Sequence, residues 1–144
     1  MKKSDKPIRI QRKRTKGWKM PLNTVYVGRG SKWGNPCKIY KDKMNSSLLP
    51  CGWRVYDEGQ PLRFFEESSA IHQSVNLYKK WLKRKIKSGE LDISELRGKN
   101  LACWCPILDK SGQYCKCHAD VLLSIANNLT LIEVENENST LSIL

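Results

Sequence analysis

Two cysteine-rich segments near residue 110 constrain the fold of this chain more than any other feature. The first, Leu101-Ala-Cys-Trp-Cys105, is short and apolar, which predicts a buried strand over 100–104. The second, Cys115-Lys-Cys-His-Ala-Asp120, leads into an apolar stretch with helical spacing over 119–127. A strand that passes through a loop into a helix is typical of α/β folds, and the loop lies at the carboxyl end of the strand. We therefore expect a single small α/β domain with a compact mixed or mostly parallel sheet and flanking helices.

Other segments supply the remaining elements of such a domain. Alternating and β-branched residues predict strands over 8–12 and 23–27, and a short helical turn is expected over 92–96. A helix is expected over 66–87 because apolar residues recur there every three or four positions, at Ile71, Val75, Tyr78, Leu82 and Ile86. Residues 37–63 are expected to form an irregular insertion or a hairpin. We divide the chain into a basic arm over 1–7, a domain over 8–129, and an edge strand (130–134) or acidic tail over 130–144.

The charge of the chain favours anionic partners. Its 144 residues include 26 Lys and Arg against 14 Asp and Glu, a net charge of +12, and no Lys or Arg follows Lys116. Such a balance biases binding toward nucleotides, nucleic acids or anionic lipid without choosing among them. No apolar run is long enough to span a membrane, and no apolar stretch follows the basic N-terminal residues as in a secretory signal. We expect a cytoplasmic protein without a membrane partner.

Cysteines supply the strongest candidate site. In a reducing compartment, metal binding or reactive thiols are better explanations than disulfides for six cysteines. Cys103 and Cys105 lie two apart on a strand and so share a face, while Cys117 lies at a helix start, where the amide dipoles lower the pKa of a thiol. The flanking Cys37 and Cys51 lie far from this group in sequence.

Three interpretations of the cysteine-rich segments remain open. The first is a zinc site, whose four ligands would come from Cys103, Cys105, Cys115, Cys117 and His118. Against it, the C-x-C spacing departs from common zinc knuckles, and adjacent residues such as Cys117 and His118 cannot easily both reach one ion. The second is a catalytic or ligand-binding pocket in which Cys117, His118 and Asp120 act as nucleophile, acid or base. The third is a small core of buried thiols with His and Asp capping the helix.

A glycine-rich loop, Tyr26-Val-Gly-Arg-Gly-Ser-Lys-Trp-Gly-Asn-Pro36, is the second candidate site. It follows an expected strand, so its amides could approach a phosphate that an arginine clamps. It lacks the spacing of a Walker loop or a G-x-G-x-x-G fingerprint. The competing interpretation is a structural turn in which the tryptophan and the proline simply pack. The candidate ligand-binding residues are Arg29, Gly30, Ser31, Trp33 and Asn35. Among them, Trp33 could stack on a base and Asn35 could read its edge.

Basic residues interleaved with tryptophan form a third feature. They are typical of a surface that follows a nucleic-acid backbone. A second basic cluster lies on the expected long helix, where a solvated face is an equally good explanation. The two clusters are Arg9, Arg12, Lys13, Arg14, Lys16, Trp18 and Lys19, and Lys79, Lys80, Lys83, Arg84, Lys85 and Lys87.

In wording and order, several motifs over about residues 8–128 resemble the domain of unknown function 4326, an uncharacterised family of bacteriophages and bacteria. They are Tyr26-Val-Gly-Arg29, Lys32-Trp-Gly-Asn-Pro36, Tyr78-Lys-Lys-Trp-Leu82, Leu96-Arg-Gly-Lys99, Leu101-Ala-Cys-Trp-Cys-Pro106 and Cys117-His-Ala-Asp-Val-Leu122. The resemblance implies a shared site that excludes Cys37, Cys51 and Cys115 and comprises Arg29, Trp33, Asn35, Cys103, Cys105, Cys117, His118 and Asp120. A fainter similarity over about twenty residues to the domain of unknown function 488, thought to be Rossmann-like, implies a pocket between the two motif loops.

Together these features predict that the two motif loops meet at the carboxyl edge of the sheet. The pocket there would bind a phosphate-bearing nucleotide or a nucleic-acid end, and it could act on that ligand as an enzyme. One alternative is a zinc-braced module that binds DNA or RNA without chemistry. Another, suggested by the phage setting that the resemblance implies, is a protein of the host cytoplasm that sequesters a host nucleotide or blocks a host factor.

Overall fold

The computed structural model describes residues 6–41 and 52–143. Residues 1–5 of the expected basic arm, and Cys51, lie outside this range. The elements in chain order are β1 (Arg9–Gln11), β2 (Thr24–Tyr26), β3 (Ile39–Lys41), β4 (Trp53–Asp57), β5 (Gln60–Phe64), α1 (Glu67–Lys87), the 3₁₀ helix η1 (Ile93–Leu96), β6 (Asn100–Cys103), α2 (His118–Asn127) and α3 (Leu131–Ile143).

A parallel sheet of three strands, in the order β1-β6-β2, forms the centre of the fold. Leu101 of β6 is paired with Arg9 on one side and Val25 on the other. Both connections in this sheet therefore run between parallel strands, which requires crossovers. This arrangement confirms the expected α/β class and the predicted strands near residues 8–12, 23–27 and 100–104.

A separate antiparallel sheet, in the order β3-β4-β5, occupies the region expected to be irregular or a hairpin. Strands β4 and β5 form that hairpin, with Asp57 paired to Gln60. The two residues between them, Glu58 and Gly59, both have positive φ angles, of 49° and 81°. A two-residue turn of this kind matches the right-handed twist of the strands it joins.

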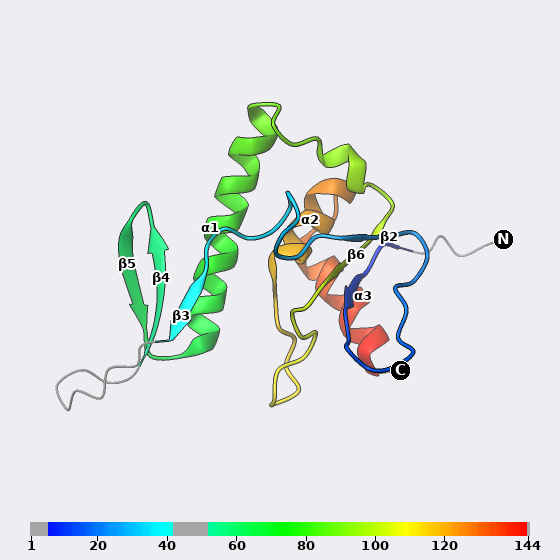
Figure 1. Cartoon of the computed structure of the whole chain (residues 1–144), viewed down its shortest axis with the longest axis horizontal. Coiled ribbons are helices and arrows are strands. Elements are labelled where there is room, and N and C mark those ends of the chain that lie inside the picture. Colours follow the sequence, from blue (N-terminus) through cyan, green and yellow to red (C-terminus); the bar gives the residue numbers. More distant parts are fainter. Residues whose placement is uncertain (1–5, 42–51, 144) are drawn as a thin grey trace.

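Helix α1 packs against both halves of the molecule. Val75, Tyr78 and Leu82 belong to the main core, whereas Ala70 and Leu77 pack with Val55 of β4 in a smaller cluster. In Figure 1 the helix accordingly stands between the small antiparallel sheet and the rest of the chain. The predicted apolar stripe is confirmed, and a second face on the same helix holds the added sheet.

Helix α3 replaces the edge strand that was expected over 130–134, so that prediction was wrong. Thr130 and Glu133 cap the helix reciprocally: the Glu133 amide donates to Thr130 Oγ1 at 3.1 Å, and the Thr130 amide donates to Glu133 Oε2 at 2.7 Å. These bonds satisfy two of the amides that a helix start leaves free. Val134 and Asn138 are buried, and Asn138 Oδ1 accepts the Arg9 amide of β1 at 2.8 Å. The C-terminal segment therefore extends the domain.

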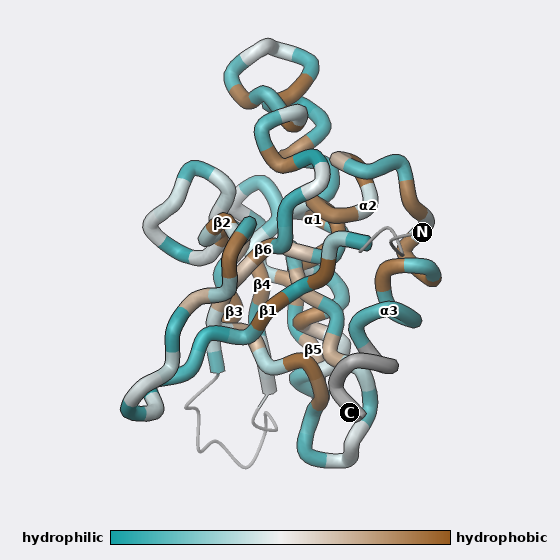
Figure 2. Tube along the Cα trace, turned by 90° about the vertical axis from the view of Figure 1, so that its right-hand side faces the viewer, coloured by the Kyte–Doolittle hydropathy of each residue, from teal (hydrophilic) through white to brown (hydrophobic). Residues whose placement is uncertain are grey.

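The main core brings the carboxyl ends of β2 and β6 to the start of α2. Leu101 and Cys103 of β6 pack in it with Val121 and Leu122 of α2. In Figure 2, β6 lies in the middle of the molecule between β1 and β2. Trp104, expected at the end of the buried strand, follows β6 and is 40% exposed. Among the described helices, none has the length and apolar character needed to cross a bilayer.

Candidate metal centre

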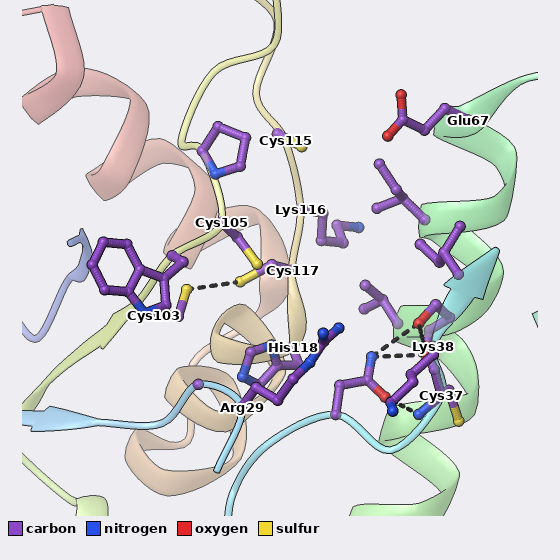
Figure 3. Close-up of a pocket in the computed structure, with 18 residues that line it drawn as sticks. Arg29, Cys37, Lys38, Glu67, Cys103, Cys105, Cys115, Lys116, Cys117 and His118 are labelled. Carbon is purple, nitrogen blue, oxygen red and sulfur yellow. Dashed lines mark hydrogen bonds between the residues drawn. The ribbon is translucent and has the colours of Figure 1, made fainter. Parts of the chain in front are cut away.

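A cavity of about 510 Å³ opens where the two motif loops meet. Its lining comes from the segment after β2, the segment after β6, one face of α1 and the start of α2 (Figure 3). Parallel strands end at the same edge of a sheet, which is why loops far apart in sequence meet here.

Three cysteine side chains cluster at the wall of this cavity. Their sulfur atoms all lie within 4.8 Å of one another, and the Cys103 and Cys117 sulfurs are 3.7 Å apart. Figure 3 shows the Cys105 sulfur pointing toward the same place. Cys103 and Cys117 are buried and Cys105 is half-buried. All three are free thiols, and together they could hold a metal ion such as zinc.

Their surroundings favour a thiolate at Cys117. It is the N-cap residue of α2, and its sulfur accepts the Ala119 amide at 3.3 Å. Burial raises the pKa of Cys117, but hydrogen bonds with Cys103 and Cys105, the charge of Arg9 and a contact with His118 outweigh it and hold the pKa well below its ordinary value. The same hydrogen bonds, with burial, raise the pKa of Cys103. Of these two thiols, Cys117 is therefore the one that ionises first.

The first amides of α2 are already bonded to Cys117. The Ala119 amide is fully buried against the Cys117 sulfur, and the Asp120 amide donates to the Cys117 carbonyl at 3.0 Å. The helix start thus directs its positive dipole at the thiol.

His118 lines the cavity next to the sulfurs but lies outside the metal cluster. Its Nε2 lies 2.7 Å from the Val27 carbonyl oxygen, so this nitrogen carries a proton and donates it there. Burial lowers the pKa of His118, but interactions with Cys105, Cys117 and the Val27 carbonyl raise it to about 10. The imidazole ring also packs edge-on against Tyr78. Of the two adjacent candidates Cys117 and His118, only Cys117 belongs to the group of side chains that could hold a metal ion.

Asp120, expected to be catalytic, does not line the cavity. Its Oδ2 accepts the Cys117 amide at 2.9 Å and lies 3.7 Å from Arg9 Nη1, and both of these charged side chains are at most 2% exposed. Tyr114 donates its hydroxyl to the other carboxylate oxygen. Burial raises the pKa of Asp120 to about 6, although the Arg9 charge opposes the shift. Its position corrects the prediction: Asp120 fixes the start of α2 from behind the thiols.

The glycine-rich loop is placed beside the cavity, but most of its side chains serve the fold. Trp33 is 3% exposed within the core, so its indole cannot stack on a ligand, which corrects the expected role. Asn35 lines the cavity while its amide is occupied by Ser74 Oγ and the Cys37 backbone. Ser31 Oγ closes the turn on the Gly28 carbonyl, at 2.7 Å.

The turn itself, with its glycines, positions Arg29. A Cβ atom on Gly28 would lie 2.6 Å from the Tyr26 hydroxyl, so only glycine fits where the loop folds back on that ring. Gly30 has a positive φ of 94° and does not line the cavity. Arg29, in contrast, lines the cavity as expected for a ligand-binding residue.

Three cations line the cavity: Arg29, Lys38 and Lys116. None of the three forms an ion pair with another described residue. In Figure 3, the Lys116 side chain extends into the space between the thiols and α1. Glu67, at the start of α1, is the acidic residue in the lining. The charged side chains of the cavity wall are therefore mainly cationic, which favours an anionic ligand.

Cys115 and Cys37 line the same cavity, but neither belongs to the described metal cluster. Cys115 is half-buried with its carbonyl bonded to Arg9 Nη2 at 2.8 Å. Burial raises the pKa of both thiols. The four-ligand set that included Cys115 and His118 is thus reduced in the structure to three cysteines.

Sequence reasoning missed the roles of Arg9, Lys38 and Lys116 at this site. Arg9 had been assigned to a basic surface, yet it is buried behind the thiols and its Nη2 bonds the Pro106 and Cys115 carbonyls. The sequence signal for a buried role is that Arg9 lies in a strand. The partners of Arg9 could not be inferred, because they lie about a hundred residues away in sequence.

A family model described as a domain of unknown function, DUF4326, matches residues 10–128. The match begins at the second residue of β1, runs to the end of α2 and covers all of the cavity lining described above. No curated protein and no solved structure matches the chain.

Proposed function

The chain belongs to the DUF4326 family, and we propose that its cavity carries a zinc ion on Cys103, Cys105 and Cys117 and binds the phosphate of a nucleotide beside it. The proposal combines the thiol cluster with the cationic wall that faces it.

The observation that carries the proposal is the spacing of the sulfurs. Two thiolates that each bind a tetrahedral zinc at about 2.3 Å are about 3.8 Å apart. The 3.7 Å between the Cys103 and Cys117 sulfurs matches this value, and a disulfide would be far shorter, at about 2.05 Å. Zinc binding would deprotonate the thiols, and the cation between them would offset the repulsion of the thiolate charges. The helix dipole and buried Arg9 add further positive charge behind Cys117.

The number of ligands favours a role in binding or chemistry over a purely structural one. Structural zinc sites have four protein ligands, whereas catalytic sites have three and keep one position open. Among the described residues the cluster offers three, and all three line the cavity. An open coordination position would therefore be available to a ligand there.

The rest of the lining suits a nucleotide. Arg29, Lys38 and Lys116 can hold a phosphate by charge-assisted hydrogen bonds, and zinc would supply Lewis-acid polarisation of a phosphoryl oxygen. Apolar side chains of α1, Ile71 and Val75, line another part of the wall and could contact a sugar or base. With zinc bound, Cys117 acts as a ligand, and His118 lines the cavity beside it.

Native mass spectrometry of the purified chain tests both parts of the proposal. We expect one zinc ion per chain, and Cys105→Ser to lose it because a hydroxyl is a much weaker zinc ligand than a thiolate. Cys115→Ser is the matched control, since this cysteine lines the same cavity outside the cluster, and it should retain zinc. Cobalt substitution should give intense thiolate-to-metal charge-transfer absorption in the wild type and in Cys115→Ser.

Native mass spectra recorded in the presence of adenosine monophosphate test whether the cavity binds a nucleotide. Lys116→Gln should weaken binding about 10-fold, the loss expected for a hydrogen bond to a charged group, while Lys83→Gln on the exposed face of α1 should not. Metal-free, folded protein that takes up no zinc would refute the metal site. If such protein nevertheless consumed the nucleotide, and Cys117→Ser abolished this, Cys117 would be a nucleophile instead.

A further inference from the structure

Outside the cavity, two arginines and two aromatic rings form a layered group that we call the Arg–aromatic stack: Arg12, Arg14, Tyr26 and Trp104. The Arg12 guanidinium lies 4.9 Å from the centre of the Tyr26 ring and 4.8 Å from that of Trp104. Arg14 lies 5.1 Å from the same Trp104 ring. These are cation–π distances, so the four side chains form one preorganised surface.

The parallel sheet brings the members of the stack together. Tyr26 ends β2, Trp104 follows β6 directly, and Arg12 follows β1 directly. Gln11 is paired with Cys103 in the sheet register, so Arg12 and Trp104 come next on neighbouring strands. The stack therefore lies at the same carboxyl edge as the metal centre, and Trp104 also lines the cavity.

The charge of the stack is not neutralised within the described chain. Arg12, Lys13 and Arg14 form no ion pair with a described acidic residue, whereas Lys32 and Lys85 elsewhere do. Lys13 and Arg14 are exposed, and Trp104 is 40% exposed despite being a large aromatic residue. A surface with free cations and a solvent-facing indole is complementary to a partner that is both anionic and aromatic.

We propose that the Arg–aromatic stack binds single-stranded nucleic acid. Unpaired bases can stack on Trp104, and the basic side chains beside it can contact the phosphates. In a duplex the bases are already stacked on each other. An anionic membrane has no aromatic rings, and an acidic protein does not present a regular series of them next to its charges. A strand bound there passes the mouth of the cavity, since Trp104 belongs to both.

This inference deepens the proposed function, because it makes a nucleic-acid strand the source of the nucleotide. It rests on the proposed function only for the statement that the strand leads to the cavity. Binding to the stack does not require the metal, so each of the two can fail without the other.

Fluorescence anisotropy with a labelled 12-mer of deoxythymidine tests the proposal on the full chain. We expect Trp104→Ala to weaken binding about 5-fold or more, the effect of losing one stacked base, and Trp104→Phe to restore most of it. Arg14→Gln should weaken binding and reduce the slope of log affinity against log salt by about 0.7, the change for one phosphate contact on a single strand. Lys87→Gln, which removes one charge from the exposed end of α1, is the matched control and should change affinity less than twofold.

Zinc content measured on the same samples separates this proposal from the previous one. Trp104→Ala should keep its zinc, and Cys105→Ser should lose zinc while binding the 12-mer as the wild type does. The stack is excluded as the binding surface if Trp104→Ala and Lys87→Gln bind equally. Equal affinity for a duplex of the same sequence, or for anionic vesicles, with no effect of Trp104→Ala, would show general attraction of a basic protein to polyanions.

Discussion

Arg9 and Asp120 form a buried ion pair behind the thiols, and each compensates the burial of the other. Arg9 Nη1 lies 3.7 Å from Asp120 Oδ2, and both side chains are almost completely inaccessible. Asp120 also accepts a hydrogen bond from the Cys117 amide, and Arg9 donates hydrogen bonds to the carbonyl oxygens of Pro106 and Cys115. The pair thus connects β1 to both segments that carry the cysteines.

Asp120→Asn should lower the free energy of unfolding by about 3 kcal/mol, because it removes the carboxylate that is paired with the buried Arg9 charge. Asparagine is nearly the same size and can still accept the Cys117 amide, so the effect reports the lost charge together with the oxygen that accepts the Tyr114 hydroxyl. Urea denaturation of both proteins measures the difference.

Glu95→Gln is the control for this prediction, since it removes the carboxylate of the exposed Lys32–Glu95 pair. Exposed pairs contribute at most about 1 kcal/mol, so we expect little change. Equal effects of Asp120→Asn and Glu95→Gln would mean that Cys117 and the two backbone carbonyls stabilise the buried Arg9 without the carboxylate.

For single residues, the sequence shows which side chains gather near the site, but it does not show the role of each one. The C-x-C alternation on a strand and the helix start at Cys117 correctly indicate a group of thiols on one side. Asp120 and Trp33 are polar or aromatic residues in a conspicuous motif, yet both are buried. Their motif positions reflect packing and capping, which residue type alone does not distinguish from ligand binding.

The starts of α2 and α3 are both fixed by reciprocal caps. In α2 the cap is Cys117 with Asp120, and in α3 it is Thr130 with Glu133. The Thr-x-x-Glu pattern is readable in the sequence and is a helix-start signal, so α3 could have been predicted. The β-branched residues that follow, which favour a strand locally, are outweighed because Val134 and Asn138 become buried against the rest of the domain.

Thr130→Ala should destabilise the start of α3 by about 1 kcal/mol, because the Glu133 amide loses its acceptor. Hydrogen exchange of the Val134 amide, which bonds to the Thr130 carbonyl, should accelerate accordingly.

The matched variant for the α3 cap is Glu133→Gln, which can still accept the Thr130 amide and should exchange almost as slowly as the wild type. Unchanged exchange at Val134 in Thr130→Ala would show that packing alone holds the first turn of α3.

For the molecule as a whole, the sequence predicts the class of fold and the meeting of the two loops, but not the second sheet or the cavity walls. Alternation and helical spacing are local signals, and the strand-to-helix order implies the parallel sheet. The antiparallel sheet depends on Ala70 and Leu77, which lie beside the expected stripe of α1. Lys38 and Lys116 line the same cavity because of the tertiary structure, which no local sequence pattern predicts.

The proposed metal would join elements that are otherwise linked by a loop. Two of its ligands lie at and just beyond the end of β6, and the third begins α2. Zinc that binds the folded chain at a thousand times its dissociation constant adds about 4 kcal/mol of stability. For a domain of this size we therefore expect chelation to lower the melting temperature by roughly 10–15 °C.

Thermal unfolding with and without a chelator measures this shift, and returning zinc should reverse it. Cys115→Ser should show the same shift as the wild type, whereas Cys105→Ser should melt at the lower temperature under both conditions. A chelator shift that persists in Cys105→Ser would place the metal elsewhere in the chain. If magnesium restored the melting temperature as well as zinc does, the thiol cluster would be excluded as the site, because hard cations prefer oxygen ligands to thiolates.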